Sequence, residues 1–266
     1  MSAVPQTAVP PGFPRRNTGS LWLLPLRLIY AAYAGAVFLA LALLALLPLA
    51  VIPTLAGRRR LIRRVGRTVL TLMGMPVRVR WHGPLPEPCI VVANHSSYLD
   101  GVVLAAILPP RFDFVIKREV NAVPLAGFLL QRIGVQFVTR DNRAGRLRDA
   151  LRVMRSAAGG GSLAFFPEGT FLEQPGLLRF HTGAFAAAQR SGAPIVPLVI
   201  RGTRHCLAPG SFLPRPGRIS VDTLAPMWPV PGHSEAAATL RDAARAAILD
   251  ALGEVDAAEA NAGAHR

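Results

Sequence analysis

Cysteine, lysine and acidic residues are scarce in this chain of 266 residues. Its two cysteines, Cys89 and Cys206, lie far apart and in no paired motif, which argues against a disulfide framework or a zinc knuckle and fits a reducing compartment. The sequence contains no glycine-rich phosphate loop of the P-loop or dinucleotide type, and no internal repeat. Its length leaves room for one large domain and an appendage.

Negative charge is missing altogether from the first third of the chain. No Asp or Glu precedes Glu87, so the eleven arginines of residues 1–86 have no acidic counterpart there. A nucleic-acid-binding protein would carry its basic residues on the folded domain, interleaved with aromatic and polar side chains. Here the basic excess flanks an apolar segment, which predicts an anionic membrane surface as partner and no nucleic acid.

The N-terminal part of the chain divides into two segments. Residues 1–20 are rich in proline and small residues and are predicted to form a disordered tail. Residues 21–70 are predicted to hold a membrane-anchoring helix and a basic juxtamembrane segment. Positions 28–56 carry no charge, and the twenty residues before Pro48 would form a helix of about 30 Å, the thickness of the hydrocarbon core.

Three alternatives to a spanning helix stay open at this point. They are a signal peptide, a buried core helix, and a helical hairpin in one leaflet in which Pro48 and Pro53 turn the chain. The arginines that follow outnumber those before the segment, so the positive-inside rule places the downstream domain on the cytoplasmic side of the inner membrane. This cluster consists of Arg58, Arg59, Arg60, Arg63, Arg64 and Arg67.

From residue 71 to residue 266 the pattern alternates between strands and helices. Short apolar or alternating runs predict strands at 76–81, 89–94, 112–116, 135–139, 162–167, 194–200 and 218–224. Helical periodicity predicts helices at 101–108, 124–134, 143–157, 182–192 and 234–253, the last with Ser234 as N-cap. The predicted fold class is therefore α/β, with a largely parallel central sheet flanked by helices and an N-terminal membrane-associated helical segment.

Polar residues follow three of these strands, where ligands bind in such folds. One group runs from Asn94 to Asp100, a second ends the stretch "GVQFVTR" with Arg140, and a third is Glu168-Gly169-Thr170 in "FFPEGTF". A histidine after a strand is more often structural than catalytic. Three polar strand ends in one domain are stronger together than any of them alone.

Over about residues 74–205 the chain resembles the lysophospholipid and glycerol-phosphate acyltransferase family. Four family blocks appear in order, namely "NHSSYLD", "GVQFVTR", "FPEGT" and "APIVPLVI". The resemblance implies an acyltransferase domain over 71–266, membrane association and a cytoplasmic active site. Its implied co-substrate is acyl-CoA or acyl carrier protein, with no metal and no other cofactor, because a thioester is already activated.

In this chemistry His95 is the expected general base and Asp100 its partner. An unperturbed imidazole titrates near neutrality, so it can take the proton of an attacking hydroxyl and return it to the departing thiolate. The carboxylate would hold the ring in the useful tautomer and stabilise the imidazolium. Because the nucleophile belongs to the substrate, Ser96 and Ser97 are expected to cap the next helix instead. Its first N–H groups are candidates for stabilising the oxyanion.

The resemblance also implies residues that bind the acceptor. Arg140 would pair with its phosphate, while Glu168, Gly169 and Thr170 would shape its pocket. Lys117, the single lysine, matches a basic residue of the family between the first two blocks and is a candidate substrate contact. The alternatives are a surface arginine for Arg140 and an ordinary turn for Glu168-Gly169-Thr170.

The sequence departs from the family pattern after Glu-Gly-Thr. Phe171 stands where an arginine is usual, and His181-Thr182 stand where basic residues are usual, although Arg179 is near in sequence. The expected reaction is acylation of a lysophospholipid hydroxyl, with lysophosphatidic acid as leading acceptor and phosphatidic acid as product. The alternatives are another lysolipid, such as one containing an amino acid, and a non-catalytic membrane-binding module.

Overall fold

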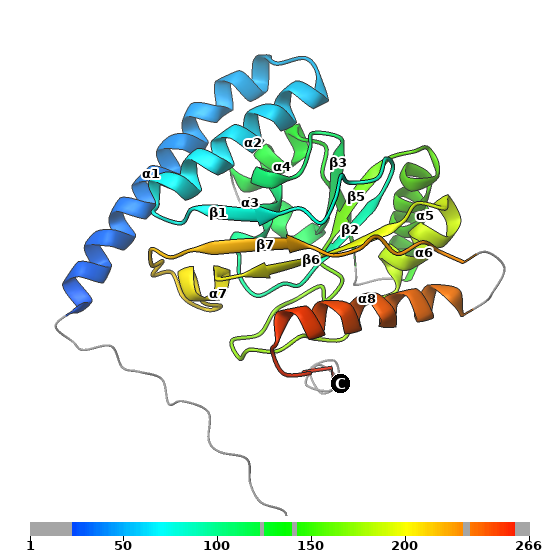
Figure 1. The fold of residues 1–266 in the computed structure, drawn as a ribbon. Helices are drawn as coiled ribbons and strands as arrows, with labels where there is room; N and C mark the ends of the chain where they lie inside the picture. The colour runs from blue at the N-terminus through cyan, green and yellow to red at the C-terminus, as the bar shows by residue number, and fades with distance from the viewer. Residues whose placement is uncertain (1–22, 123–124, 140–142, 231–234, 259–266) are drawn as a thin grey trace, which may run out of the picture.

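The computed structural model describes residues 23–122, 125–139, 143–230 and 235–258, without the side chains of 143–147. Its centre is a seven-stranded sheet with helices on both faces (Figure 1). The order of strands across the sheet is β1-β7-β6-β2-β5-β3-β4. The strands are β1 (Val77–Arg80), β2 (Ile90–Ala93), β3 (Phe112–Lys117), β4 (Gln136–Val138), β5 (Ser162–Phe165), β6 (Ile195–Arg201) and β7 (Ile219–Thr223).

The sheet is largely parallel, as predicted. Strands β4, β3, β5, β2 and β6 are parallel to one another, whereas β7 is antiparallel to β6 and parallel to β1. Every residue of the central strand β2 is buried, which explains its continuous apolar run, while the edge strand β1 alternates between half-buried and exposed residues. The carboxyl ends of β2, β5, β3 and β4 therefore meet at one edge of the sheet.

Two helical layers cover the sheet. The first layer contains α1 (Leu24–Val51), α2 (Leu55–Leu72) and α3 (Leu99–Ile107), and the second contains α5 (Arg143–Ala158), α6 (Gly183–Ser191) and α8 (Ala236–Leu252). Within β2, Val91 and Ala93 face the first layer and Ile90 and Val92 the second, as the alternation of a strand requires. The remaining elements are η2 (Arg118–Ala122), α4 (Ala126–Arg132) and α7 (Thr203–Cys206). The predicted N-cap Ser234 lies outside the described residues.

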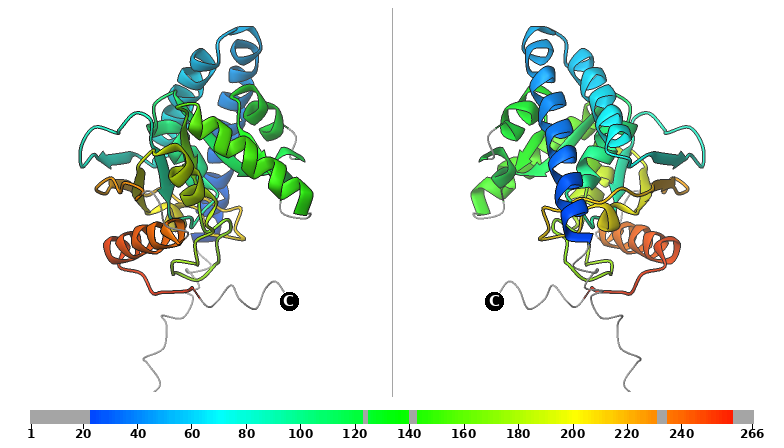
Figure 2. Two further views of the ribbon diagram at one scale, coloured as in Figure 1. Left: turned by 90° about the vertical axis from the view of Figure 1, so that its right-hand side faces the viewer. Right: turned by 90° about the vertical axis from the view of Figure 1, so that its left-hand side faces the viewer.

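The two N-terminal helices form a hairpin that lies along the domain (Figure 2). Thr54 begins α2 by accepting a hydrogen bond from the N–H of Gly57 at 3.2 Å. Near the start of α1, the Tyr33 hydroxyl donates to the Leu72 carbonyl at the end of α2, at 2.8 Å. At the other end of α1, Arg132 of α4 donates to the Leu49 carbonyl at 2.8 Å. α1 is therefore attached to the folded domain at Tyr33 and at Leu49, whereas Leu24, Leu26, Leu28 and Ile29 at its N-terminal end are exposed.

Most of α1 is nevertheless exposed, although Arg27 is its single charged residue. Its buried residues form one strip against α2 and α4: Ala34, Ala42, Ala45 and Leu49. In the described part of the chain it is the one helix long and apolar enough to cross a membrane.

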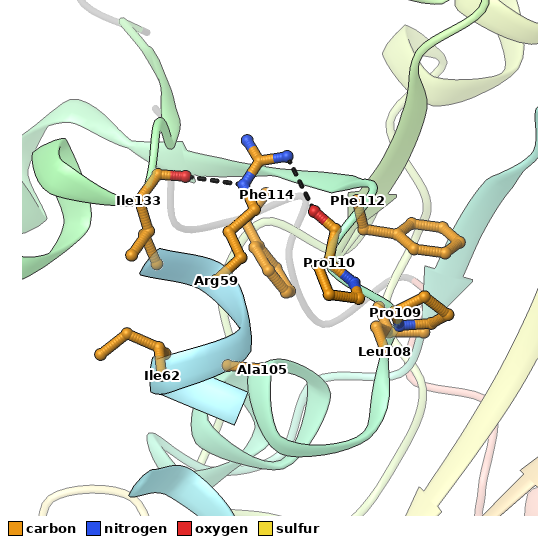
Figure 3. A pocket seen from close by; sticks show the side chains of 9 residues that line it. All are labelled: Arg59, Ile62, Ala105, Leu108, Pro109, Pro110, Phe112, Phe114 and Ile133. Atoms are coloured by element: carbon orange, nitrogen blue, oxygen red, sulfur yellow. Dashed lines mark hydrogen bonds between the residues drawn. The ribbon is translucent and has the colours of Figure 1, made fainter. Parts of the chain in front are cut away.

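The basic segment of α2 has a different arrangement from the one expected of a uniform membrane-facing cluster. Arg59 is buried, with 8% of its side chain exposed, and it donates to the Ile133 carbonyl at 2.9 Å and the Pro110 carbonyl at 3.2 Å (Figure 3). It also forms an ion pair with Asp113 of β3. Arg59 thus attaches α2 to the domain. The exposed arginines of α2 recur at the spacing of one helical face: Arg60, Arg64 and Arg67.

Candidate active site

The predicted site residues gather at the carboxyl edge of the sheet. His95 follows β2, Glu168 follows β5, and Lys117 is the last residue of β3, in register with Val138 of β4. The structure thus confirms that neighbouring strands bring these sequence-distant positions to one edge. Arg140, expected to follow β4, lies outside the described residues.

His95 and Asp100 form the pair expected from their spacing. The Nδ1 atom of His95 is 2.9 Å from Oδ2 of Asp100, and this carboxylate oxygen also accepts the N–H groups of Ser96 at 2.6 Å and Ser97 at 2.8 Å. Asp100 lies in the first turn of α3 and is fully buried, so its carboxylate folds back onto the turn before the helix. Three donors converging on one oxygen fix the orientation of the imidazole ring.

These hydrogen bonds bear on the roles expected at this turn. The N–H groups of Ser96 and Ser97 donate to Asp100, and the oxyanion role expected of the first N–H groups of α3 stays a prediction. The hydroxyl of Ser97 accepts the Leu99 N–H at 3.2 Å, which fits the capping role, and donates to the Leu207 carbonyl at 2.7 Å. The hydroxyl of Ser96 instead lies 3.1 Å from that of Thr203, in α7. Both serines are buried, and their hydrogen bonds hold residues 94–98, the turn between β2 and α3 that carries the predicted base and is here called the catalytic turn.

Glu168 supports the same turn from the neighbouring strand. Its Oε1 accepts the His95 N–H at 2.6 Å and its Oε2 accepts the Leu178 N–H at 2.8 Å, with the residue only 1% exposed. Burial raises the pKa of this carboxyl to about 8, against the lowering effect of the two N–H donors. The structure therefore gives Glu168 a positioning role, and its contact with substrate stays a prediction.

The two residues after Glu168 belong to the turn that follows β5. Gly169 has φ of +69°, a conformation that favours glycine, and its N–H donates to the Phe166 carbonyl at 3.0 Å. Thr170 is half-buried. The predicted pocket role of this pair stays a prediction.

Aromatic rings surround the imidazole of His95, and sequence reasoning missed most of them. The Phe166 ring stacks on it with centroids 4.2 Å apart, and the Phe171 ring meets it edge-on at 4.4 Å. Tyr98, which is 62% exposed, contacts Phe171 at 4.9 Å. The sequence marked Phe171 as a departure from the family pattern, but nothing in it indicated that this ring lies against His95.

Two cationic residues considered for the acceptor, Lys117 and Arg179, are among the described residues. Lys117 is half-buried at the end of β3. Arg179 is exposed and faces α8, where Asp242 has a lowered pKa, chiefly because of Arg241 and with a smaller contribution from Arg179. Arg179 therefore interacts electrostatically with the carboxylate of Asp242.

Comparisons with known proteins agree with this geometry. Residues 77–201 match the family model described as Acyltransferase. The chain is 33% identical over 124 residues to a chloroplastic 1-acyl-sn-glycerol-3-phosphate acyltransferase of Brassica napus, covering 47% of this chain and 36% of that protein. It is 36% identical over 127 residues to a lyso-ornithine lipid O-acyltransferase of Pseudomonas aeruginosa, covering 47% and 48%. This segment of the chain, residues 77–201, is thus similar to proteins of the acyltransferase family.

A solved structure shares the fold. The crystal structure of a 1-acyl-sn-glycerophosphate acyltransferase from Thermotoga maritima superposes with a TM-score of 0.67 at 20% identity, covering 87% of this chain and 96% of that one. The chain spans about half the length, or less, of the curated relatives described above.

Proposed function

We propose that this protein transfers a fatty acyl group from acyl-CoA or acyl carrier protein to the hydroxyl of a lysophospholipid. The observation that carries the proposal is the His95–Asp100 pair, held by backbone N–H groups at the carboxyl edge of a parallel sheet. The match of residues 77–201 to the acyltransferase family model supports it. The alternative of a non-catalytic membrane-binding module gives no reason for this arrangement.

The orientation of His95 suggests a route for the proton of the acceptor hydroxyl. Because Nδ1 of His95 faces Asp100, Nε2 is the nitrogen available to the acceptor hydroxyl. As the hydroxyl oxygen bonds to the thioester carbonyl carbon, its proton passes to Nε2, and the buried carboxylate stabilises the resulting imidazolium. The carbon–sulfur bond then breaks, and the proton moves from Nε2 to the departing thiolate. No metal or further cofactor enters these steps.

The leading acceptor is lysophosphatidic acid, which would yield phosphatidic acid in phospholipid biosynthesis. Relatives named as 1-acyl-sn-glycerol-3-phosphate acyltransferases support it. In this proposal Arg140 and Lys117 supply positive charge, while Glu168, Gly169 and Thr170 shape the pocket.

A second acceptor has its own structural support. Phe171 occupies the position of an expected arginine and lies against His95 and Tyr98. An aromatic surface next to the base favours a less anionic headgroup, such as that of an amino-acid-containing lysolipid. A relative named as a lyso-ornithine lipid O-acyltransferase agrees with this acceptor.

Membrane association is part of the proposal, with the catalytic domain on the cytoplasmic side of the inner membrane. Because α1 is bound to the domain at Tyr33 and Leu49 and packs along α2, this part of α1 cannot cross a bilayer alone without drawing the arginines of α2 into hydrocarbon. This packing favours the hairpin interpretation over a spanning helix. The apolar face of α1 would lie in one leaflet, and the exposed arginines of α2 would face lipid headgroups.

Replacement of His95 by Ala tests the activity. In the full-length protein it should reduce acyl transfer about a hundredfold or more, since a positioned base contributes about that much. The matched control is His82→Ala, because His82 is exposed and lies after the edge strand β1. Sedimentation with vesicles should not change in either variant. Near-native turnover of His95→Ala would refute the mechanism, and wild-type protein inactive on all lysolipids would favour the binding module.

A competition assay with mixed lysolipids tests the acceptor. Phe171→Arg should shift the product ratio toward phosphatidic acid by roughly tenfold or more, because one charge-assisted contact contributes about 1.5–3 kcal/mol. Phe171→Leu is the control for losing the ring without gaining charge. If Phe171→Arg and Phe171→Leu give the same ratio, this position does not select acceptor charge.

A further inference from the structure

One ordered loop presents a large aromatic side chain almost completely to solvent. In residues 207–217, here called the Phe212 loop, Phe212 is 91% exposed. Hydrogen bonds shape the loop, because the Arg215 N–H donates to the Cys206 carbonyl at 2.7 Å and the Ser211 N–H donates to the Ala208 carbonyl at 3.1 Å. These backbone hydrogen bonds close the loop at its base and leave Phe212 at its exposed tip. An exposed aromatic group in a structured loop indicates a contact surface.

The two ends of the Phe212 loop are attached to the catalytic turn and to the N-terminal hairpin. At its start, the Leu207 carbonyl accepts the Ser97 hydroxyl at 2.7 Å. At its end, the Gly217 N–H donates at 3.2 Å to the carbonyl of Gly74, two residues after α2. In Figure 1, α7 and the loop after it lie beside the N-terminal half of α1. The loop thus extends the exposed apolar surface at this end of α1, which includes Leu26 and Ile29.

A second loop connects the Phe212 loop to the aromatic residues around His95. Arg204 of α7 donates to the carbonyls of Leu172 and Gln174, each at 2.7 Å, which fixes the chain directly after Phe171. The carboxylate of Glu173 lies so close to Gly210 that a Cβ there would be 2.9 Å from Oε1. The Phe212 loop therefore lies next to the segment after Phe171, and Phe171 in turn contacts the imidazole of His95.

We propose that the Phe212 loop is a second membrane contact, which inserts Phe212 into the lipid headgroup region and thereby places the His95 site at the bilayer surface. The occupant is the surface of an anionic bilayer, because two exposed basic residues, Arg215 and Arg218, follow the tip of the loop. The lysolipid acceptor then reaches His95 from the leaflet without crossing water. This inference deepens the proposed function and rests on it for the identity of the acceptor.

Site-selective labelling tests the contact directly. A polarity-sensitive fluorophore is attached to full-length Phe212→Cys or, as control, Trp228→Cys. Trp228 is 64% exposed and follows β7 at the opposite edge of the sheet, because β7 runs antiparallel to β6. The native thiols of Cys89 and Cys206 are buried, and burial raises the pKa of both to about 11, so they stay protonated and unlabelled near pH 7.5.

Quenching by nitroxide-labelled lipids in anionic vesicles gives the readout. We expect quenching at position 212 and none at position 228. Absence of quenching at 212 in protein that sediments with the same vesicles would overturn the proposal. Equal quenching at both positions would also overturn it, since the contact would then not be specific to this loop.

A kinetic comparison connects the contact to catalysis. The measured quantity is the ratio of the rate with long-chain lysolipid in vesicles to the rate with a monomeric short-chain lysolipid. Phe212→Asp should lower this ratio about tenfold, the order expected when a Phe side chain no longer leaves water for the membrane interface. Trp228→Asp should leave it unchanged. An unchanged ratio in Phe212→Asp refutes a role for the loop in acceptor delivery.

The two proposals fail in distinguishable ways. If position 212 is quenched but wild-type protein acylates no lysolipid in either form, the membrane contact stands and the proposed function fails. If wild-type protein acylates lysolipids while position 212 is not quenched, the proposed function stands and the contact fails. Phe212→Ser, which adds no charge, repeats the kinetic test if Phe212→Asp lowers the yield of folded protein.

Discussion

Replacement of Asp100 by Asn separates the charge of this residue from its hydrogen bonds. All three donors on Asp100 meet at Oδ2, whereas Oδ1 is buried without a hydrogen-bond partner among the described residues. An asparagine can place its carbonyl oxygen where Oδ2 lies and keep the three donors. Its NH2 group then occupies the position of Oδ1.

Asp100→Asn should affect both the stability of the protein and its kcat. A buried NH2 group without an acceptor should lower the free energy of unfolding by about 1–3 kcal/mol. Loss of the charge weakens the bond to the imidazolium that forms during the reaction, and a charge-assisted hydrogen bond contributes about 1.5–3 kcal/mol. We therefore expect kcat to fall about ten- to a hundredfold in Asp100→Asn.

The assay measures release of free thiol from the thioester donor, together with denaturant unfolding of the same preparations. Asp100→Ala removes the acceptor of all three donors, so it should lose more stability than Asp100→Asn and at least as much activity. Asp242→Asn is the matched control, because Asp242 is 63% exposed in α8. A kcat for Asp100→Asn within about threefold of wild type would refute the role given to the charge.

Three further predictions concern other described residues. Burial raises the pKa of Glu168 from 4.5 to about 8, so between these pH values the folded state keeps a proton that the unfolded state loses. The free energy of unfolding should therefore fall from pH 4.5 to pH 8. Glu168→Gln should remove this pH dependence. Parallel curves for the two proteins in denaturant unfolding at pH 5, 6.5 and 8 would contradict it. Ser97→Ala should keep substantial activity but lose about 1–3 kcal/mol of stability in the same unfolding assay, because the buried Leu99 N–H loses its acceptor and the half-buried Leu207 carbonyl loses its donor. Abolished turnover in folded protein would instead favour a covalent role. The three exposed arginines of α2 are Arg60, Arg64 and Arg67. Their replacement by glutamine should weaken sedimentation with anionic vesicles at low salt more than at high salt. Salt-independent binding would contradict an electrostatic contribution.

The sequence alone determined the elements and the chemistry at the end of β2. Strand and helix periodicities depend on neighbours a few residues apart, so the predicted strands and most helices agree with the structure to within a few residues. The pairing of His95 with Asp100 is also local, because five residues between a strand and the first turn of a helix bring the side chains together. The sequence treated α2 as a juxtamembrane segment and did not predict that its residues Val69 and Leu70 enter the core.

Only the tertiary structure decided what surrounds that pair. The contacts of Glu168 with the catalytic turn and of Phe171 with His95 join residues more than seventy positions apart, and side-chain periodicity carries no information about such distances. Burial likewise separated Arg59, which attaches α2 to the domain, from the exposed arginines of the same run. Local spacing specifies which groups can react, whereas packing between distant segments determines which groups hold and cover them.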